Sequence, residues 1–249
     1  MPLPDHRPRV LILAAGQGRR FRAAGGAGCK SLTPVAGTTP LAWTLAVLAG
    51  AGAPEVCIVV GCEAGAIRES VAAAGYPGRV SFVTNEMWAG TDSAYSFVLG
   101  AAWLPGPILL TYADVLVTPA IVERFLASPD RDYLAVDATR PSGAWDMRAR
   151  VDGDRVRQLG KQLGPRDSQG ESACVFRFRA DTAAFISSRA RPVLAAEPSI
   201  QFERMLSALL PELPVRPLWC GSGEWCEVDV PADVAAAADL VAQVRSAAG

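Results

Sequence analysis

Histidine is nearly absent from this sequence, since His6 is the only one among 249 residues. A Ser-His-Asp triad, a Cys-His catalytic pair and a histidine-ligated zinc site are therefore close to excluded. The six cysteines include no C-x-x-C pair, so a four-cysteine zinc site is not expected either. Several of the cysteines lie in apolar runs, which is typical of small buried thiols in a reducing compartment.

An excess of charge of one sign and a long hydrophobic run are also missing. The formal net charge is −1, so we do not expect the protein to hold nucleic acid by bulk charge. No apolar stretch reaches membrane-spanning length, and the N-terminus lacks a basic-then-apolar signal pattern. We therefore expect a cytoplasmic protein with neither nucleic acid nor a membrane as partner. Carboxylates, lysines and arginines remain for chemistry, and they suit phosphate and metal ions.

Half of the residues are hydrophobic, and their spacing predicts alternating strands and helices. The expected strands are residues 10–15, 56–60, 80–84, 107–112, 133–137, 149–151, 156–159, 173–178, 215–218 and 225–228. The expected helices are residues 40–49, 63–74, 93–103, 119–127, 181–188, 199–210 and 231–246.

The alternation predicts an α/β fold with three layers, α/β/α, around a mixed, mostly parallel, Rossmann-like sheet. The turn at residues 152–154 reads Asp-Gly-Asp, which predicts a small hairpin lid in the second half of the chain. The last strand, residues 225–228, is expected to return to the sheet. No repeat or long linker appears, so we expect a single domain over residues 1–249.

Two glycine-rich segments near the N-terminus resemble nucleotide loops that they do not match. Residues 16–21 begin like a dinucleotide fingerprint, but Phe21 stands where the third glycine is required. Residues 25–31 resemble a P-loop, but Cys29 replaces the glycine that must precede the lysine. Neither a Rossmann dehydrogenase nor a P-loop enzyme is therefore expected.

A different phosphate loop fits better. Residues 13–21 read LAAGQGRRF, and residues 30–37 read KSLTPVAG, followed by Pro40 and Leu41. This pattern resembles the signature of the nucleotidyltransferase family. Small residues let backbone N–H groups approach a triphosphate, and Arg20 and Lys30 add positive charge. The resemblance implies a nucleotide-binding loop made of Leu13, Ala14, Ala15, Gly16, Gln17 and Gly18.

Further segments extend the resemblance along the chain, and they are most similar to the bacterial phosphocholine and phosphonate cytidylyltransferase branch. Asn85 after the third strand and Ser96 in the next helix are implied to bind the nucleotide. Lys161, after the lid strand, is implied to reach the acceptor or the triphosphate. Residues 1–138 would then form the NTP-binding half, and residues 139–249 the acceptor-binding and lid half.

The carboxylates point to a metal ion on independent grounds. Asp114 and Asp229 each follow an apolar strand, so both are expected at the ligand crevice of an open α/β sheet. Mg²⁺ takes oxygen ligands, commonly one or two carboxylates together with substrate phosphates and water. Glu227 lies two residues before Asp229 on one expected strand, so both should face the same side. Glu227 is expected to ligate the metal directly or through water.

The implied reaction is nucleotidyl transfer, in which an acceptor phosphate or phosphonate oxygen attacks the α-phosphorus of an NTP and pyrophosphate leaves. Arg20 and Lys30 would hold the pyrophosphate, and Lys161 would approach from the lid. Because the attacking oxygen is already anionic, positioning and charge neutralisation suffice, and no histidine is needed.

The acceptor is the least defined part of the prediction. The resemblance to the phosphocholine branch implies that Trp145, with Asp146 beside it, lies near the acceptor, and Tyr112 is expected there too. An aromatic wall with a carboxylate suits an ammonium group. This favours a cytidylyltransferase for phosphocholine or a phosphonate such as 2-aminoethylphosphonate. A sugar-1-phosphate or inositol-phosphate nucleotidyltransferase is the alternative, and a non-catalytic nucleotide-binding module is a third hypothesis. A homodimer stays open as the oligomeric state.

Overall fold

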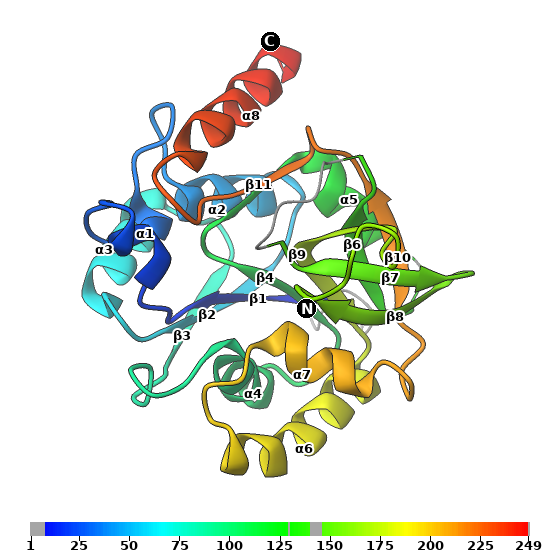
Figure 1. Cartoon of the computed structure of the whole chain (residues 1–249). Coiled ribbons are helices and arrows are strands. Elements are labelled where there is room, and N and C mark those ends of the chain that lie inside the picture. The colour runs from blue at the N-terminus through cyan, green and yellow to red at the C-terminus, as the bar shows by residue number, and fades with distance from the viewer. Residues whose placement is uncertain (1–7, 129, 140–145, 249) are drawn as a thin grey trace.

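The computed structural model describes residues 8–128, 130–139 and 146–248 (Figure 1). Within these residues the main sheet has nine strands, and seven of them follow one another in the order β10-β6-β9-β4-β1-β2-β3. These seven are β1 (Arg9–Ala14), β2 (Glu55–Val60), β3 (Arg79–Thr84), β4 (Ile108–Tyr112), β6 (Tyr133–Asp137), β9 (Gly170–Phe178) and β10 (Arg216–Cys220). All run parallel except β9, which is antiparallel to both neighbours. The mixed, mostly parallel sheet is thus confirmed.

Helices cover both faces of this sheet because β1 is apolar from Val10 to Ala14 and buries alternate residues on opposite sides. Val10 and Ile12 pack on one side, while Leu11 and Leu13 pack on the other. The Val10 side is covered by α2 (Pro40–Gly50), α3 (Ala64–Ala74), α5 (Pro119–Ala127) and α8 (Asp233–Ala248). The Leu11 side is covered by α4 (Ser93–Trp103), α6 (Ala180–Ala196) and α7 (Phe202–Leu209), which lie together in Figure 1. The three-layer α/β/α prediction is therefore confirmed.

A hairpin from the second half of the chain extends the main sheet. Strands β7 (Arg148–Asp152) and β8 (Arg155–Gly160) pair antiparallel around a turn in which Gly153 has a φ of 59°. A φ of this sign favours glycine, as the Asp-Gly-Asp turn predicted. Strand β7 also pairs with the first residues of β9, on the opposite edge from β6, so the hairpin is attached to the main sheet.

Two sequence-based predictions about elements were wrong. Strand β11 (Trp225–Glu227) does not return to the main sheet, because it pairs antiparallel with β5 (Val115–Val117), a short strand that the sequence pattern did not separate from β4. Helix α6 continues past the predicted end at Ser188 to Ala196, with Pro192 inside it. Its residues Ile186, Ala190 and Leu194 recur every four positions and are buried, which favours continuing the helix.

An aromatic cluster fixes the position of α7 against α4 and the sheet. The ring of Phe202 lies 4.6 Å from that of Phe97 and 5.4 Å from that of Phe176, measured between centroids. Such offset or edge-on pairs add to the stability that burial provides. The hydroxyl of Ser93, at the start of α4, also accepts a hydrogen bond of 2.8 Å from the backbone N–H of Phe202. The first turns of α4 and α7 are thereby held together at the edge of the crevice.

No helix in the described part of the chain is both long enough and apolar enough to cross a membrane.

Candidate active site

The glycine-rich loop leaves β1 at the carboxyl end of the parallel strands, where α/β proteins bind ligands. Leu13, Ala14 and Ala15 are buried at the end of the strand, and the chain then turns into α1 (Arg19–Ala23). Gly18 has a φ of 61° and precedes this helix, so the turn favours glycine. A Cβ atom at Gly18 would lie 3.7 Å from Cγ of Lys30, which places the loop against that side chain.

Hydrogen bonds attach this loop to residues 85–92. The Gln17 amide donates to the carbonyl of Ala89 at 3.2 Å, and the Arg19 guanidinium donates to the same oxygen at 3.4 Å. Gly16 has open space where a Cβ would stand, so packing does not require glycine there. The contacts fix the course of the loop, and its role in binding a nucleotide stays a prediction.

Asn85 and Ser96 lie beside this loop and are both buried. The Asn85 amide donates to the hydroxyls of Thr91 at 3.0 Å and Ser96 at 3.2 Å, and its oxygen accepts from the N–H of Met87 at 3.0 Å. These bonds use both N–H groups of the amide to shape residues 85–92. The predicted contact of Asn85 and Ser96 with a nucleotide stays a prediction.

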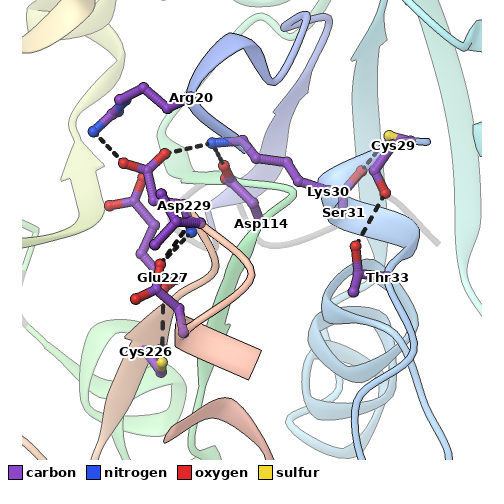
Figure 2. Close-up of polar contacts among 11 residues, drawn as sticks. Arg20, Cys29, Lys30, Ser31, Thr33, Asp114, Cys226, Glu227 and Asp229 are labelled. Atoms are coloured by element: carbon purple, nitrogen blue, oxygen red, sulfur yellow. Dashed lines mark hydrogen bonds and ion pairs between the residues drawn. The ribbon is translucent and has the colours of Figure 1, made fainter. Parts of the chain in front are cut away.

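Four predicted site residues meet in one ion-pair network (Figure 2). The Lys30 ammonium pairs with the carboxylate of Asp114 and, at 3.0 Å, with that of Asp229, while Arg20 pairs with the other oxygen of Asp229. These residues come from α1, from the short helix η1 (Lys30–Leu32), and from the segments after β4 and β11. The structure thus joins four residues that the sequence placed far apart.

Glu227 adds a third carboxylate to the network. Burial raises the pKa of Glu227 from 4.5 to about 8, and the charges of Asp114 and Asp229 add to the rise while Lys30 and Arg20 oppose it. Burial alone would lower the pKa of Lys30, but the three carboxylates hold it above its ordinary value. The network therefore has more acidic than basic groups.

The backbone after β11 is held in place by Asp233. Its carboxylate accepts the N–H groups of Asp229 and Val230, each at 2.8 Å, and the N–H of Val228 donates to the carbonyl of Asp114 at 2.9 Å. Because β11 ends at Glu227, the strand alternation predicted for Glu227 and Asp229 does not extend to Asp229. Glu227 and Asp229 nevertheless both lie close enough to Lys30 for their charges to raise its pKa.

No group of three acidic, cysteine or histidine side chains is arranged to hold a metal ion within the described ranges. Asp114 and Asp229 instead converge on a positive charge, the ammonium of Lys30. Two carboxylates directed at one cation fit a divalent ion whose remaining ligands are substrate phosphates and water. The residues therefore fit a metal that arrives with a nucleotide, rather than a complete protein cage.

The predicted acceptor residues are only partly placed. Trp145 lies outside the described residues, and Asp146 is half-buried just before β7. The Tyr112 hydroxyl donates a hydrogen bond of 2.7 Å to Glu203, a buried residue in the first turn of α7 that the sequence analysis missed. Burial raises the pKa of Glu203, and the charge of Lys161, just after β8, is among the groups that oppose this rise. A glutamate in a first helical turn is common, so no sequence signal marked Glu203.

Segments of this chain are similar in sequence to parts of known proteins. A segment of 153 residues, 60% of the chain, is 38% identical to CMP-5'-(3-aminopropyl)phosphonate synthase of Streptomyces rubellomurinus, of which it covers 24%. Another, covering 47% of the chain, is 31% identical to 25% of the bifunctional protein GlmU of Geotalea daltonii. The chain thus spans about a quarter of the length of the curated relatives it matches.

Solved structures match over nearly the whole chain. The inositol-1-phosphate CTP transferase from T. maritima has a TM-score of 0.81 at 18% identity and covers 98% of both chains. The CTP:phosphocholine cytidylyltransferase of Streptococcus pneumoniae has a TM-score of 0.74 at 20% identity, over 94% of this chain and 99% of its own. These likenesses confirm the predicted nucleotidyltransferase fold.

The family follows from a model of the MobA-like NTP transferase domain, which matches residues 10–212. The match covers the glycine-rich loop, Lys30 and Asp114, and ends before β11. The chain belongs to the MobA-like NTP transferase family.

Proposed function

We propose that the protein is a Mg²⁺-dependent cytidylyltransferase that transfers CMP from CTP to an aminoalkylphosphonate and releases pyrophosphate. The observation that carries this proposal is the meeting of Arg20, Lys30, Asp114 and Asp229 beside the glycine-rich loop. The segment that is 38% identical to an aminopropylphosphonate CMP synthase supports the choice of nucleotide and acceptor.

The chemistry needs charge and position more than a base. A phosphonate oxygen, already anionic, forms a bond to the α-phosphorus of CTP while the bond to the β-phosphate oxygen breaks. Negative charge builds on the leaving pyrophosphate, and Arg20 and Lys30 are the cations nearest to the loop that would hold it. A Mg²⁺ ion held by Asp114 and Asp229 would neutralise phosphate charge when bound.

Binding a triphosphate requires the ion pairs of the network to separate. Arg20 has a half-exposed side chain, so it can leave Asp229 for a phosphate at little cost. Lys30 is more buried and lies between two carboxylates, so it leaves them only when phosphate replaces their negative charge. In the free protein the two carboxylates therefore hold Lys30 and Arg20 next to the proposed triphosphate site.

The acceptor end provides the remaining groups. Lys161 has no ion-pair partner among the described residues and is the cation proposed to meet the phosphonate. Tyr112, which lies two residues before Asp114 at the end of β4, is proposed to line the acceptor site. Residues 13–18, together with Asn85 and Ser96, are proposed to contact or shape the nucleotide site.

A matrix of nucleotides against acceptors tests the proposal, with pyrophosphate release as the readout. We expect CTP with an aminoalkylphosphonate to give the highest kcat/KM, above phosphocholine and well above any sugar-1-phosphate or inositol phosphate. A sugar-1-phosphate or inositol phosphate as best acceptor, with any nucleotide, would replace this function with the alternative one.

A further inference from the structure

We propose that Glu203 determines acceptor specificity by receiving the ammonium group of the acceptor in a site that it shares with Tyr112. The assignment rests on the proposed function, because it concerns the acceptor of the same reaction. It identifies the carboxylate that would select acceptors carrying an amine.

The carboxylate of Glu203 is held rigidly. Its oxygen accepts the 2.7 Å hydrogen bond from Tyr112, which closes β4. The neighbouring Phe202 is fixed on both sides, by its N–H bond to Ser93 and by the ring of Phe97. A recognition group held on packed elements can discriminate between ligands more sharply than one on a mobile chain.

Glu203 is buried, and burial raises the pKa of its carboxyl group above the ordinary value. The hydroxyl of Tyr112 donates a hydrogen bond to this carboxyl group, which favours the ionised form but does not outweigh burial. Among the described residues Glu203 has no ion-pair partner, in contrast to Asp114 and Asp229. The charge of Asp92 raises the pKa of Glu203 further, while the charge of Lys161 opposes the rise. The ionised form of such a buried carboxyl group is costly unless a ligand supplies the opposite charge.

Glu203 and the carboxylates around Lys30 share a neighbour, Cys174. The thiol of Cys174 is buried, which raises its pKa, and the charges of Glu227, Glu203 and Asp114 raise it further. These three carboxyl groups therefore all lie near one thiol, and Tyr112, which binds Glu203, is only two residues before Asp114. An acceptor with an anionic phosphonate at one end and an ammonium at the other complements this arrangement.

The test compares two acceptors that differ only in the amine, 3-aminopropylphosphonate and propylphosphonate, with CTP as donor. For Glu203→Gln we expect kcat/KM for 3-aminopropylphosphonate to fall about 10- to 100-fold, as for a lost hydrogen bond to a charged group. For propylphosphonate the same variant should stay within about threefold of the unaltered protein. The wild-type preference for the amine should largely disappear.

Two further variants separate charge from structure. Tyr112→Phe removes the hydrogen bond but keeps the carboxylate, so the preference for the amine should persist even if both rates fall. Glu203→Asp keeps the charge on a shorter side chain and should retain part of the preference. It also serves as the comparison if Glu203→Gln does not fold.

Equal losses on both acceptors in Glu203→Gln would overturn the assignment, because they would show that Glu203 only supports Tyr112. No loss on either acceptor would overturn it as well. Failure of the wild-type protein to release pyrophosphate with either phosphonate would instead refute the proposed function. Equal wild-type kcat/KM for the two phosphonates would refute the role of Glu203 alone.

Discussion

The two ends of the candidate site, one at Lys30 and the other at Glu203, differ in how their charged groups are paired. At the Lys30 end, Lys30 and Arg20 are paired with Asp114 and Asp229 before any substrate arrives. At the Glu203 end, the carboxylate is held by the neutral hydroxyl of Tyr112. The first end thus pairs its own charges, whereas the second holds a buried carboxyl group whose ionised form a cationic ligand would stabilise.

The difference corresponds to two binding tasks, one common to all nucleoside triphosphates and one specific to the acceptor. Every nucleoside triphosphate brings the same phosphates, so cations stored on carboxylates can serve any of them. Acceptors differ in the group they carry opposite the phosphate, and a carboxyl group whose ionised form a cation would stabilise discriminates among these groups. The internal pairing at one end and its lack at the other are therefore consistent with shared chemistry and individual specificity in one crevice.

The largest expected effect comes from removing a carboxylate at the paired end. Asp114→Asn or Asp229→Asn should lower kcat about a thousandfold or more, because charge stabilisation of the reacting phosphates is lost. The midpoint of thermal unfolding should change little, since Lys30 keeps an ion pair with the carboxylate that remains. Asp239→Asn, at an exposed position of α8, is the matched control. Activity close to wild type in both site variants at saturating Mg²⁺ would contradict the assignment of this end.

Lys30→Met should show that the pairing also stabilises the fold. Removing the cation that the partly buried carboxylates share should cost about 3 kcal/mol in urea unfolding, and kcat/KM for CTP should fall about 100-fold. Adding Asp114→Asn should recover part of the lost stability, because one of the unpaired charges is removed. Lys161→Met at the other end should cost less than about 1 kcal/mol. Equal costs for Lys30→Met and Lys161→Met would remove the distinction between the two ends.

The smallest effect is a pH dependence from Glu227. Because burial and the neighbouring carboxylates raise the pKa of Glu227 from 4.5 to about 8, the folded state holds its proton more tightly than the unfolded state. This contribution to stability is present below pH 4.5 and is lost as the pH rises towards 8. Glu227→Gln should therefore gain stability relative to wild type between pH 5 and pH 8, by about 1 kcal/mol or more. Thermal unfolding in EDTA measures it, and a constant difference across this range would contradict the prediction.

Local signals in the sequence predicted most elements well. Helices α4 and α5 have the expected bounds, because Asp92 caps the first and Pro119 begins the second. The pairing of β11 with β5 joins residues about a hundred positions apart, and nothing in either segment specifies its partner. Strand pattern alone therefore assigned β11 to the wrong sheet.

The site shows the same division between local and distant information. Family resemblance identified Arg20, Lys30, Asp114 and Asp229 one by one, with the cations assigned to phosphate and the carboxylates to metal. That these groups bind each other in the free protein depends on tertiary distances, which the motifs do not contain. Glu203 belongs to no motif, and only its hydrogen bond to Tyr112 singles it out.

The Lys30–Asp229 pair joins residues 199 positions apart in the chain, and this separation has a consequence for folding. Contacts between such distant residues close a large loop and are costly in entropy, so they tend to form late. Lys30 and Asp229 can therefore come together only after β11 has docked on β5. Regain of activity during refolding should follow the slowest structural step, which makes the enzyme a reporter of its own completed fold.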